Sequence, residues 1–334
     1  MRALLQVILL KLSILSCLTM PGCFYFEAAA GQLALINRQT PLVEAIPQQT
    51  DPQRKALLSA VPGVLAFARD VMLMDAGESY QGYVELPDRG LTYVLVAAEK
   101  TKLEPYRWWF PFAGEVEYKS FFRQEHAQEE ADELSAQGYD VYLGQSRAYS
   151  TLGYLRDPIV SSMLDEGAVA FVEVVFHELA HRRLYVAGQT EFNEQLASFV
   201  AERGCERFFS QPRLANSGLL EQWQLRREKT KRSEDLIEAA VKKLTSLYDS
   251  KASQADKLRR REIVFERLAK DLDALRTEPR AAPEIINNAR LLQFVRYGRD
   301  NPDLQQLWES CGRDFRCFWA AVKGYSRDLP APRD

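Results

Sequence analysis

The spacing of apolar residues predicts two helices early in the chain and a set of strands after them. Residues 24–42 and 52–74 carry apolar side chains at helical intervals, with Pro41 ending the first helix and Asp51 capping the second. Between residues 80 and 122, β-branched and aromatic segments are divided by glycine and proline, a pattern typical of strands. The first half of the chain therefore combines both kinds of secondary structure.

The pattern changes after residue 122 and becomes almost wholly helical from Ala168 onward. An amphipathic helix over 126–138 and a strand over 139–144 complete a small mixed β-sheet. The highly charged stretch 214–277 keeps apolar residues at helical spacing and weakens at 250–253, which predicts two antiparallel helices that form a solvated arm. Two more helices are expected near the end of the chain, over 286–298 and 314–325.

Composition and charge narrow the class of protein. The 334 residues are 46% hydrophobic and carry a net charge of -3. No basic stretch is interleaved with aromatic residues, so the sequence predicts no nucleic-acid partner. Histidine is scarce, and two of the 3 histidines fall in a single short motif.

The first 22 residues have the order of an export signal. Arg2 and Lys11 precede a short apolar run over 12–20, and the small residue Gly22 stands before Cys23. The segment MPGC resembles the lipobox of bacterial lipoproteins, in which the cysteine becomes the first mature residue and carries the lipid. We therefore expect Cys23 to anchor the protein to a membrane of the bacterial cell envelope, facing the periplasm. A plain signal peptide and a membrane-spanning segment are the alternatives.

Three further cysteines remain in the mature chain, at positions 205, 311 and 317. An oxidising compartment favours disulfide formation. A turn at Gly312 can fold Cys311 and Cys317 together, which predicts that these two pair.

The segment VFHELAH lies within a strong helical pattern over 168–186 and carries the candidate chemistry. His177 and His181 are four residues apart, so their rings project from one helix face, where both can reach one tetrahedral metal ion. Glu178 is rotated by about 100° from His177. It can therefore reach a water on the metal without ligating the ion.

A third ligand is expected from the helix that follows. Gly188 ends the first helix, and Thr190 with Glu191 starts the next by N-cap and first-turn charge. The second histidine lies seven residues before this glycine and Glu194 six residues after it, so two antiparallel helices bring both side chains to matching depth. Glu194 is the predicted third ligand. Glu202, two turns on, is the candidate carboxylate that holds a histidine N–H.

HELAH followed by FNEQLASFV resembles the gluzincin metallopeptidases, whose third zinc ligand is a glutamate on the next helix. More narrowly, the chain from Cys23 to about Tyr325 resembles the bacterial “putative aminopeptidase” family of predicted lipoproteins. The matching segments include FPFAGEVEYKSFF, GYDVYLGQSRAYSTLGYLRDPIVSSML and NNARL. The resemblance implies one zinc ion per chain, with Glu178 as the catalytic carboxylate and with His177, His181 and Glu194 as ligands.

These expectations combine into an α+β fold. A small mixed β-sheet subdomain is expected to pack on a mainly helical zincin-type domain that has an active-site helix and a long helical hairpin. The expected boundaries are a signal peptide over 1–22, a catalytic domain over 23–213, a charged helical arm over 214–278, and C-terminal helices over 279–334 that pack on the catalytic domain.

The expected function is zinc-dependent hydrolysis of peptide bonds in a peptide or protein substrate, as an aminopeptidase. A zinc endopeptidase and a non-catalytic zinc-binding scaffold of the envelope are the alternatives, and the presence of Glu178 favours catalysis. The donor to the tetrahedral oxyanion is expected from Tyr149 or Tyr154, in the loop before the active-site helix. Tyr185, one turn past His181, is expected to pack in the core.

Overall fold

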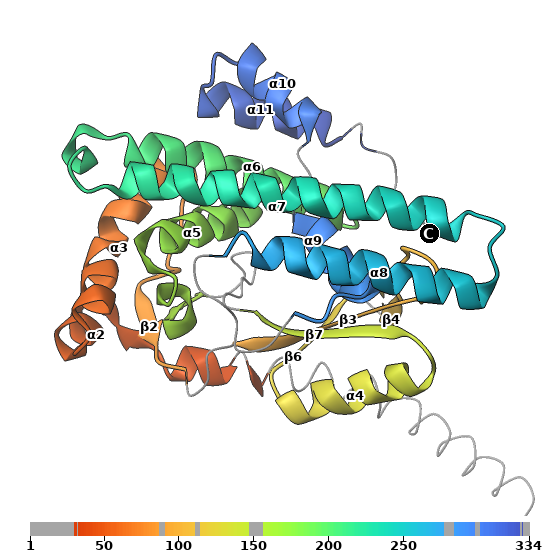
Figure 1. The fold of residues 1–334 in the computed structure, drawn as a ribbon. Coiled ribbons are helices and arrows are strands. Elements are labelled where there is room, and N and C mark those ends of the chain that lie inside the picture. Colours follow the sequence, from red (N-terminus) through yellow and green to blue (C-terminus); the bar gives the residue numbers. More distant parts are fainter. Residues whose placement is uncertain are drawn as a thin grey trace, which may run out of the picture.

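The computed structural model describes residues 30–31, 33–86, 91–110, 114–146, 156–276, 284–297, 301–327 and 329. The fold is α+β, as the sequence predicts, because helices carry most of the chain and short strands form small sheets beside them (Figure 1). The helices are α2 (Leu42–Gln48), α3 (Pro52–Asp70), α4 (Gln124–Ala136), α5 (Gly167–Arg183), α6 (Thr190–Phe209), α7 (Leu219–Tyr248), α8 (Gln254–Asp273), α9 (Asn288–Tyr297), α10 (Pro302–Ser310) and α11 (Phe315–Tyr325), with the 3-10 helices η1 (Ser161–Leu164) and η2 (Pro212–Leu214). The strands are β1 (Thr40–Pro41), β2 (Gly82–Val84), β3 (Thr92–Ala98), β4 (Trp108–Phe110), β5 (Gly114–Val116), β6 (Lys119–Phe121), β7 (Asp140–Ser146) and β8 (Ile159–Val160).

The two early helices differ from the sequence prediction at their ends. The predicted helix over 24–42 is helical in its described part only to Asn37, because Thr40 and Pro41 pair instead with β2. The next helix begins at the predicted cap, where Asp51 Oδ1 accepts hydrogen bonds from two backbone N–H groups of its first turn. It ends at Asp70 rather than Met74, since the chain folds back and the Met74 N–H binds a carbonyl of α3.

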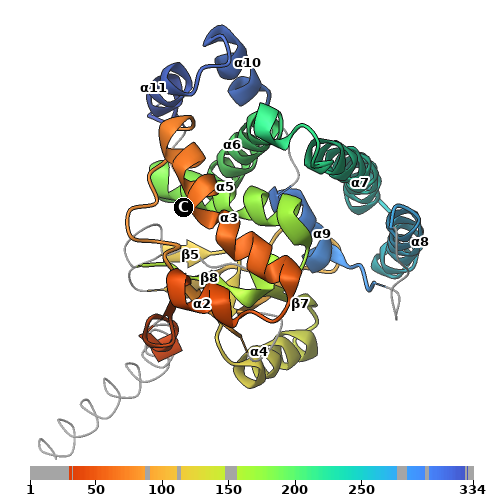
Figure 2. The same ribbon diagram turned by 90° about the vertical axis from the view of Figure 1, so that its left-hand side faces the viewer.

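The strands form several small sheets in the described part of the chain, where the sequence predicts one mixed sheet. Strands β6, β3 and β7 make an antiparallel sheet in that order, and α4 packs on it through a small apolar cluster. Strands β1, β2 and β8 make a mixed sheet, and β4 pairs with β5. Figures 1 and 2 show α4 at one end of the molecule and the pair α10 and α11 at the opposite end.

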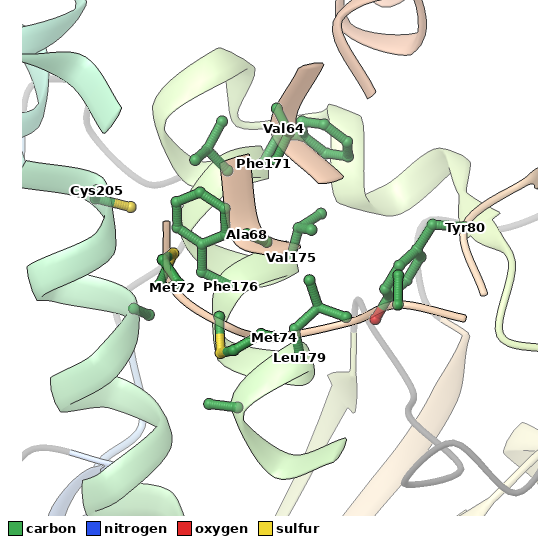
Figure 3. Packing of buried hydrophobic residues seen from close by; sticks show 14 of the residues in the cluster. Val64, Ala68, Met72, Met74, Tyr80, Phe171, Val175, Phe176, Leu179 and Cys205 are labelled. Atoms are coloured by element: carbon green, nitrogen blue, oxygen red, sulfur yellow. The ribbon is translucent and has the colours of Figure 1, made fainter. Parts of the chain in front are cut away.

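The main core lies between α3, α5 and α6. Figure 3 shows Met72 and Phe176 packed between α5 and the helix that carries Cys205. A Cβ atom at Gly204 would clash with both of these side chains, so glycine allows α6 to approach closely. Helices α10 and α11 add Trp308, Phe315 and other aromatic residues to the same core, whereas α9 packs with the hairpin and the sheet.

The charged stretch forms the predicted pair of helices, but it is not a solvated arm. Helices α7 and α8 have an apolar cluster of their own with α9, and they lie against the rest of the chain (Figure 1). Arg261 of α8 is buried and makes a bidentate ion pair with Asp140 of β7, at 2.7 and 3.0 Å. Asn288, from the NNARL segment, binds the same carboxylate and also the hydroxyl of Tyr248. This buried polar network fixes the hairpin to the sheet.

The predicted disulfide between Cys311 and Cys317 is present, in the turn between α10 and α11. Gly312 takes a positive φ of 59° in this turn, a conformation that favours glycine. Cys205 is a free, buried thiol. Among the described helices, none has the length and apolar character needed to cross a membrane.

Candidate metal centre

Two histidines on α5 face one another at the C-terminal end of this helix. The Nε2 atoms of His177 and His181 lie 3.1 Å apart, and the His181 side chain is buried. The helix forms because its sequence is apolar and free of proline, and it is buried against both α3 and α6. The sequence prediction that His177 and His181 lie one helical turn apart on one face is therefore confirmed.

The third side chain comes from α6, as the sequence predicts. Glu194 Oε2 lies 3.3 Å from His177 Nε2 and 3.6 Å from His181 Nε2. Leu184 takes extended backbone angles and leaves α5, and Gly188 turns the chain with a φ of 74°. Helix α6 then begins at Thr190, with Gln189 and not Thr190 at the N-cap position.

The surroundings of these three side chains suit a cation. The ligand atoms lie within 4.8 Å of one another, and they are mostly buried. Glu194 Oε2 and His181 Nδ1 have no hydrogen-bond partner among the described residues. Burial raises the pKa of Glu194, but the two histidine rings close to its carboxylate outweigh this effect and lower the pKa to about 2. Two imidazoles and one ionised carboxylate are the donor set of many catalytic zinc sites, so the residues fit a zinc ion.

Glu178 lies beside this group without belonging to it. Its carboxylate is not part of the cluster of potential ligand atoms among the described residues. Burial raises the pKa of Glu178; the histidines act in the opposite direction, and Glu194 and Asp157 add to the increase. A largely buried carboxylate with a raised pKa next to a candidate metal centre is suited to carry a proton.

The two arginines after the second histidine contact neighbouring segments of the chain. Arg182 Nε donates a hydrogen bond to the backbone carbonyl of Asp75 at 3.1 Å. The guanidinium of Arg183 lies over the Trp319 ring, 5.6 Å from its centroid. These contacts explain why charged residues follow the histidine motif in this chain.

Glu202 does not hold a histidine. Its carboxylate forms ion pairs with Arg227 of α7 at 2.5 Å and with Arg203 at 3.5 Å. Two turns along α6 carry this side chain past the histidines to the surface that α7 covers, and the predicted hydrogen bond is not formed. Cys23, Tyr149 and Tyr154 lie outside the described residues.

Two tyrosines near the candidate centre were not assigned to it from the sequence. Tyr185 was expected in the core, but it is 47% exposed, and its ring centroid lies 6.5 Å from that of His181. Burial and the charge of Glu194 raise its pKa. Tyr80 is deeply buried on a loop with a positive φ of 64°, and its side chain is directed toward α5 (Figure 3). Its pKa is raised by burial and then by Glu178. The position of Tyr185, one turn after His181, could have indicated that it lies near the candidate centre. The sequence around Tyr80 contains no such indication.

Two antiparallel helices that carry His-His-Glu at matching depth define a candidate metalloprotein with an α+β fold. The comparison with known families agrees with the resemblance drawn from the sequence. The chain belongs to the family described as “Putative aminopeptidase”, whose sequence model matches residues 23–334. No curated protein and no solved structure gave a significant match.

Proposed function

We propose that this protein hydrolyses peptide bonds with one zinc ion, held by His177, His181 and Glu194. The proposal depends on one observation: three potential ligand side chains from two helices converge on one point. The family description supports peptides as the substrates. It also supports the more specific activity of an aminopeptidase, which removes residues from a free N-terminus.

The residues of the chain supply the proton transfer. A zinc ion, when bound, polarises a carbonyl group and lowers the pKa of water. Glu178 takes the proton from the attacking water and returns it to the leaving amine. Its raised pKa makes the carboxylate a stronger base than an exposed glutamate.

A hydrogen-bond donor is also needed for the oxygen that becomes negative in the transition state. Tyr185 is the donor that we propose from the described residues, because its half-exposed ring lies next to His181. Tyr149 and Tyr154 remain candidates from the sequence for the same role. Such a donor contributes on the order of 3 kcal/mol to transition-state stabilisation.

The test of this function is metal content and cleavage measured on the same samples. We expect one zinc ion per chain and peptide cleavage that a chelator abolishes and added zinc restores. Glu178→Gln should keep the metal and lose at least about 99% of the activity, whereas His181→Ala should lose both. A Glu178→Gln variant with full activity would refute the mechanism. A zinc-loaded wild-type protein that cleaves no peptide would favour a binding scaffold.

We also propose that Cys23 carries a lipid that anchors the protein in the bacterial cell envelope, facing the periplasm. The export-type segment before this cysteine supports the proposal. Cys23→Ser should move the protein from the membrane to the soluble fraction after cell disruption. Unchanged membrane association of this variant would exclude the lipid anchor and favour a spanning segment.

A further inference from the structure

A cavity of about 1060 Å³ lies between α5, α7, α8 and α9. The first turn of α5, from Glu166 to Ala170, forms one of its walls, and α7 forms the opposite wall. Both apolar and charged side chains line it. The apolar ones include Val169, Leu219, Leu225, Ile237, Leu272 and Phe294.

The cavity lies on the same face of α5 as the metal centre. Glu166, Ala170, Glu173 and His177 follow one another at intervals of three or four residues, which places them along one stripe of the helix. Ala170 lies seven residues before His177, or roughly 10 Å along the helix axis. This face of α5 therefore carries both the cavity residues and the histidines.

Glu173 lies on this stripe between the cavity residues and His177, and it binds a residue of the cavity wall. Its carboxylate accepts a hydrogen bond from Arg226 Nε at 3.0 Å, and Arg226, which lines the cavity, also binds Glu166 at 3.1 Å. The ion pair of Glu173 with Arg226 therefore links the helix that carries the histidines to the wall of the cavity.

A second cavity, of about 580 Å³, adjoins the first. The two share Glu234, Ile237 and Phe294 in their walls, and the second extends to Gln195, the neighbour of the ligand Glu194. The space beneath α7 thus touches the start of α5 and one residue of α6. Helix α7 is fixed above it by the ion pair of Arg227 with Glu202.

We propose that the cavity between α5 and α7 binds the substrate peptide on one side of the scissile bond. This inference rests on the proposed function. The volume is that of a site for a small ligand, which accommodates a short unfolded segment and excludes a folded domain. An extended peptide advances about 3.3 Å per residue, so the first residue to reach the cavity is about three residues from the bond that is cut. The apolar walls favour an apolar side chain at that position.

Leu225 and Ile263 provide a matched test, because both are 59% exposed on the hairpin and only Leu225 lines the cavity. The first measurement is kcat/KM for unstructured peptides of two to eight residues, with leucine or aspartate about three residues from the bond that is cut. Wild-type protein should cleave the longer peptides at least about 10-fold better than dipeptides and should prefer leucine. Leu225→Glu should remove both effects, and Ile263→Glu should keep them.

A binding measurement separates this proposal from the proposed function. Fluorescence anisotropy of a labelled leucine-containing octapeptide is measured with Glu178→Gln protein, alone and combined with Leu225→Glu or Ile263→Glu. We expect Leu225→Glu to weaken binding about 10-fold or more at unchanged zinc content and thermal stability, and Ile263→Glu to leave it unchanged. Equal binding by both double variants, or equal cleavage of dipeptides and octapeptides by the wild type, would overturn the substrate site and leave the peptidase proposal standing. Binding that depends on Leu225 without cleavage by the wild type would support the peptide site and refute the peptidase.

Discussion

The side chain of Asn193 binds both backbone groups of Val186. Its Oδ1 accepts a hydrogen bond from the Val186 N–H and its Nδ2 donates one to the Val186 carbonyl, each at 2.8 Å. Asn193 is buried and directly precedes the proposed ligand Glu194, whereas Val186 lies in the loop that follows α5. These two hydrogen bonds set the register between α5, which carries the two histidines, and α6, which carries Glu194.

Asn193→Ala should therefore weaken zinc binding more than it weakens the fold. Residues that hold metal ligands in place typically contribute 10- to 100-fold to affinity, and we expect a loss in that range. Competition with a chromogenic chelator measures it. Glu191→Gln, on the exposed first turn of the same helix, is the control and should bind zinc like the wild type. Equal affinities for both variants would show that the Asn193 clamp has no effect on the metal centre.

Tyr185→Phe tests the donor that we propose from the described residues. Because the ring lies next to His181 and its hydroxyl is the only group removed, we expect kcat to fall about 100-fold while zinc content stays unchanged. Tyr139→Phe, in the cluster beneath the antiparallel sheet, is the matched control and should keep the wild-type kcat. Wild-type kcat in Tyr185→Phe would assign the role to another group, with Tyr149 and Tyr154 as the next variants to examine.

The raised pKa of Glu178 predicts a pH-dependent cost to stability in the metal-free protein. A carboxyl group whose pKa is higher in the folded state stabilises the fold below its unfolded pKa, and this contribution is lost as pH rises through the folded pKa. Glutamine does not titrate, so Glu178→Gln should be more stable than the wild type at pH 7, with a smaller difference near pH 4. Thermal unfolding of both proteins in chelator across this range measures it. A difference that is independent of pH would contradict the burial of an ionisable Glu178.

The buried ion pair between Arg261 and Asp140 predicts that the hairpin is part of the stable fold. Removing one partner of a buried pair leaves an uncompensated charge, so Arg261→Met should lower the free energy of unfolding by about 3 kcal/mol. Arg267→Met, on the same helix, removes an arginine that is exposed and pairs with Asp271, and should cost less than about 1 kcal/mol. Chemical denaturation compares them. Equal losses would mean that the hairpin contributes little to the cooperative fold.

Local pattern was enough to predict much of the candidate site. The spacing of His177 and His181 specifies a shared helix face, and the distances on either side of Gly188 bring Glu194 opposite them. The Cys311–Cys317 disulfide also followed from a short local turn. Such features depend on residues close in sequence, so helix geometry and turn chemistry are sufficient to place them.

Contacts between segments that are distant in the sequence could not be predicted from local pattern. Glu202 has the spacing of a residue that could support a histidine, yet Arg227, from the next helix, binds its carboxylate. The charge-rich sequence of the hairpin predicts a solvated pair of helices. Arg261 is nevertheless buried, and the carboxylate that it binds is on a strand more than a hundred residues earlier. The local sequence pattern around Glu202 and Arg261 therefore does not indicate either partner.

The sequence by itself determined the helical core, the pairing of two helices and the identity of the three potential ligands, because each follows from periodicity over a few turns. Only the tertiary structure decided how α7 and α8 dock, which tyrosine lies beside His181, and where a cavity remains beneath α7. These depend on which surfaces meet, and that choice is made by burial and charge pairing across the whole chain.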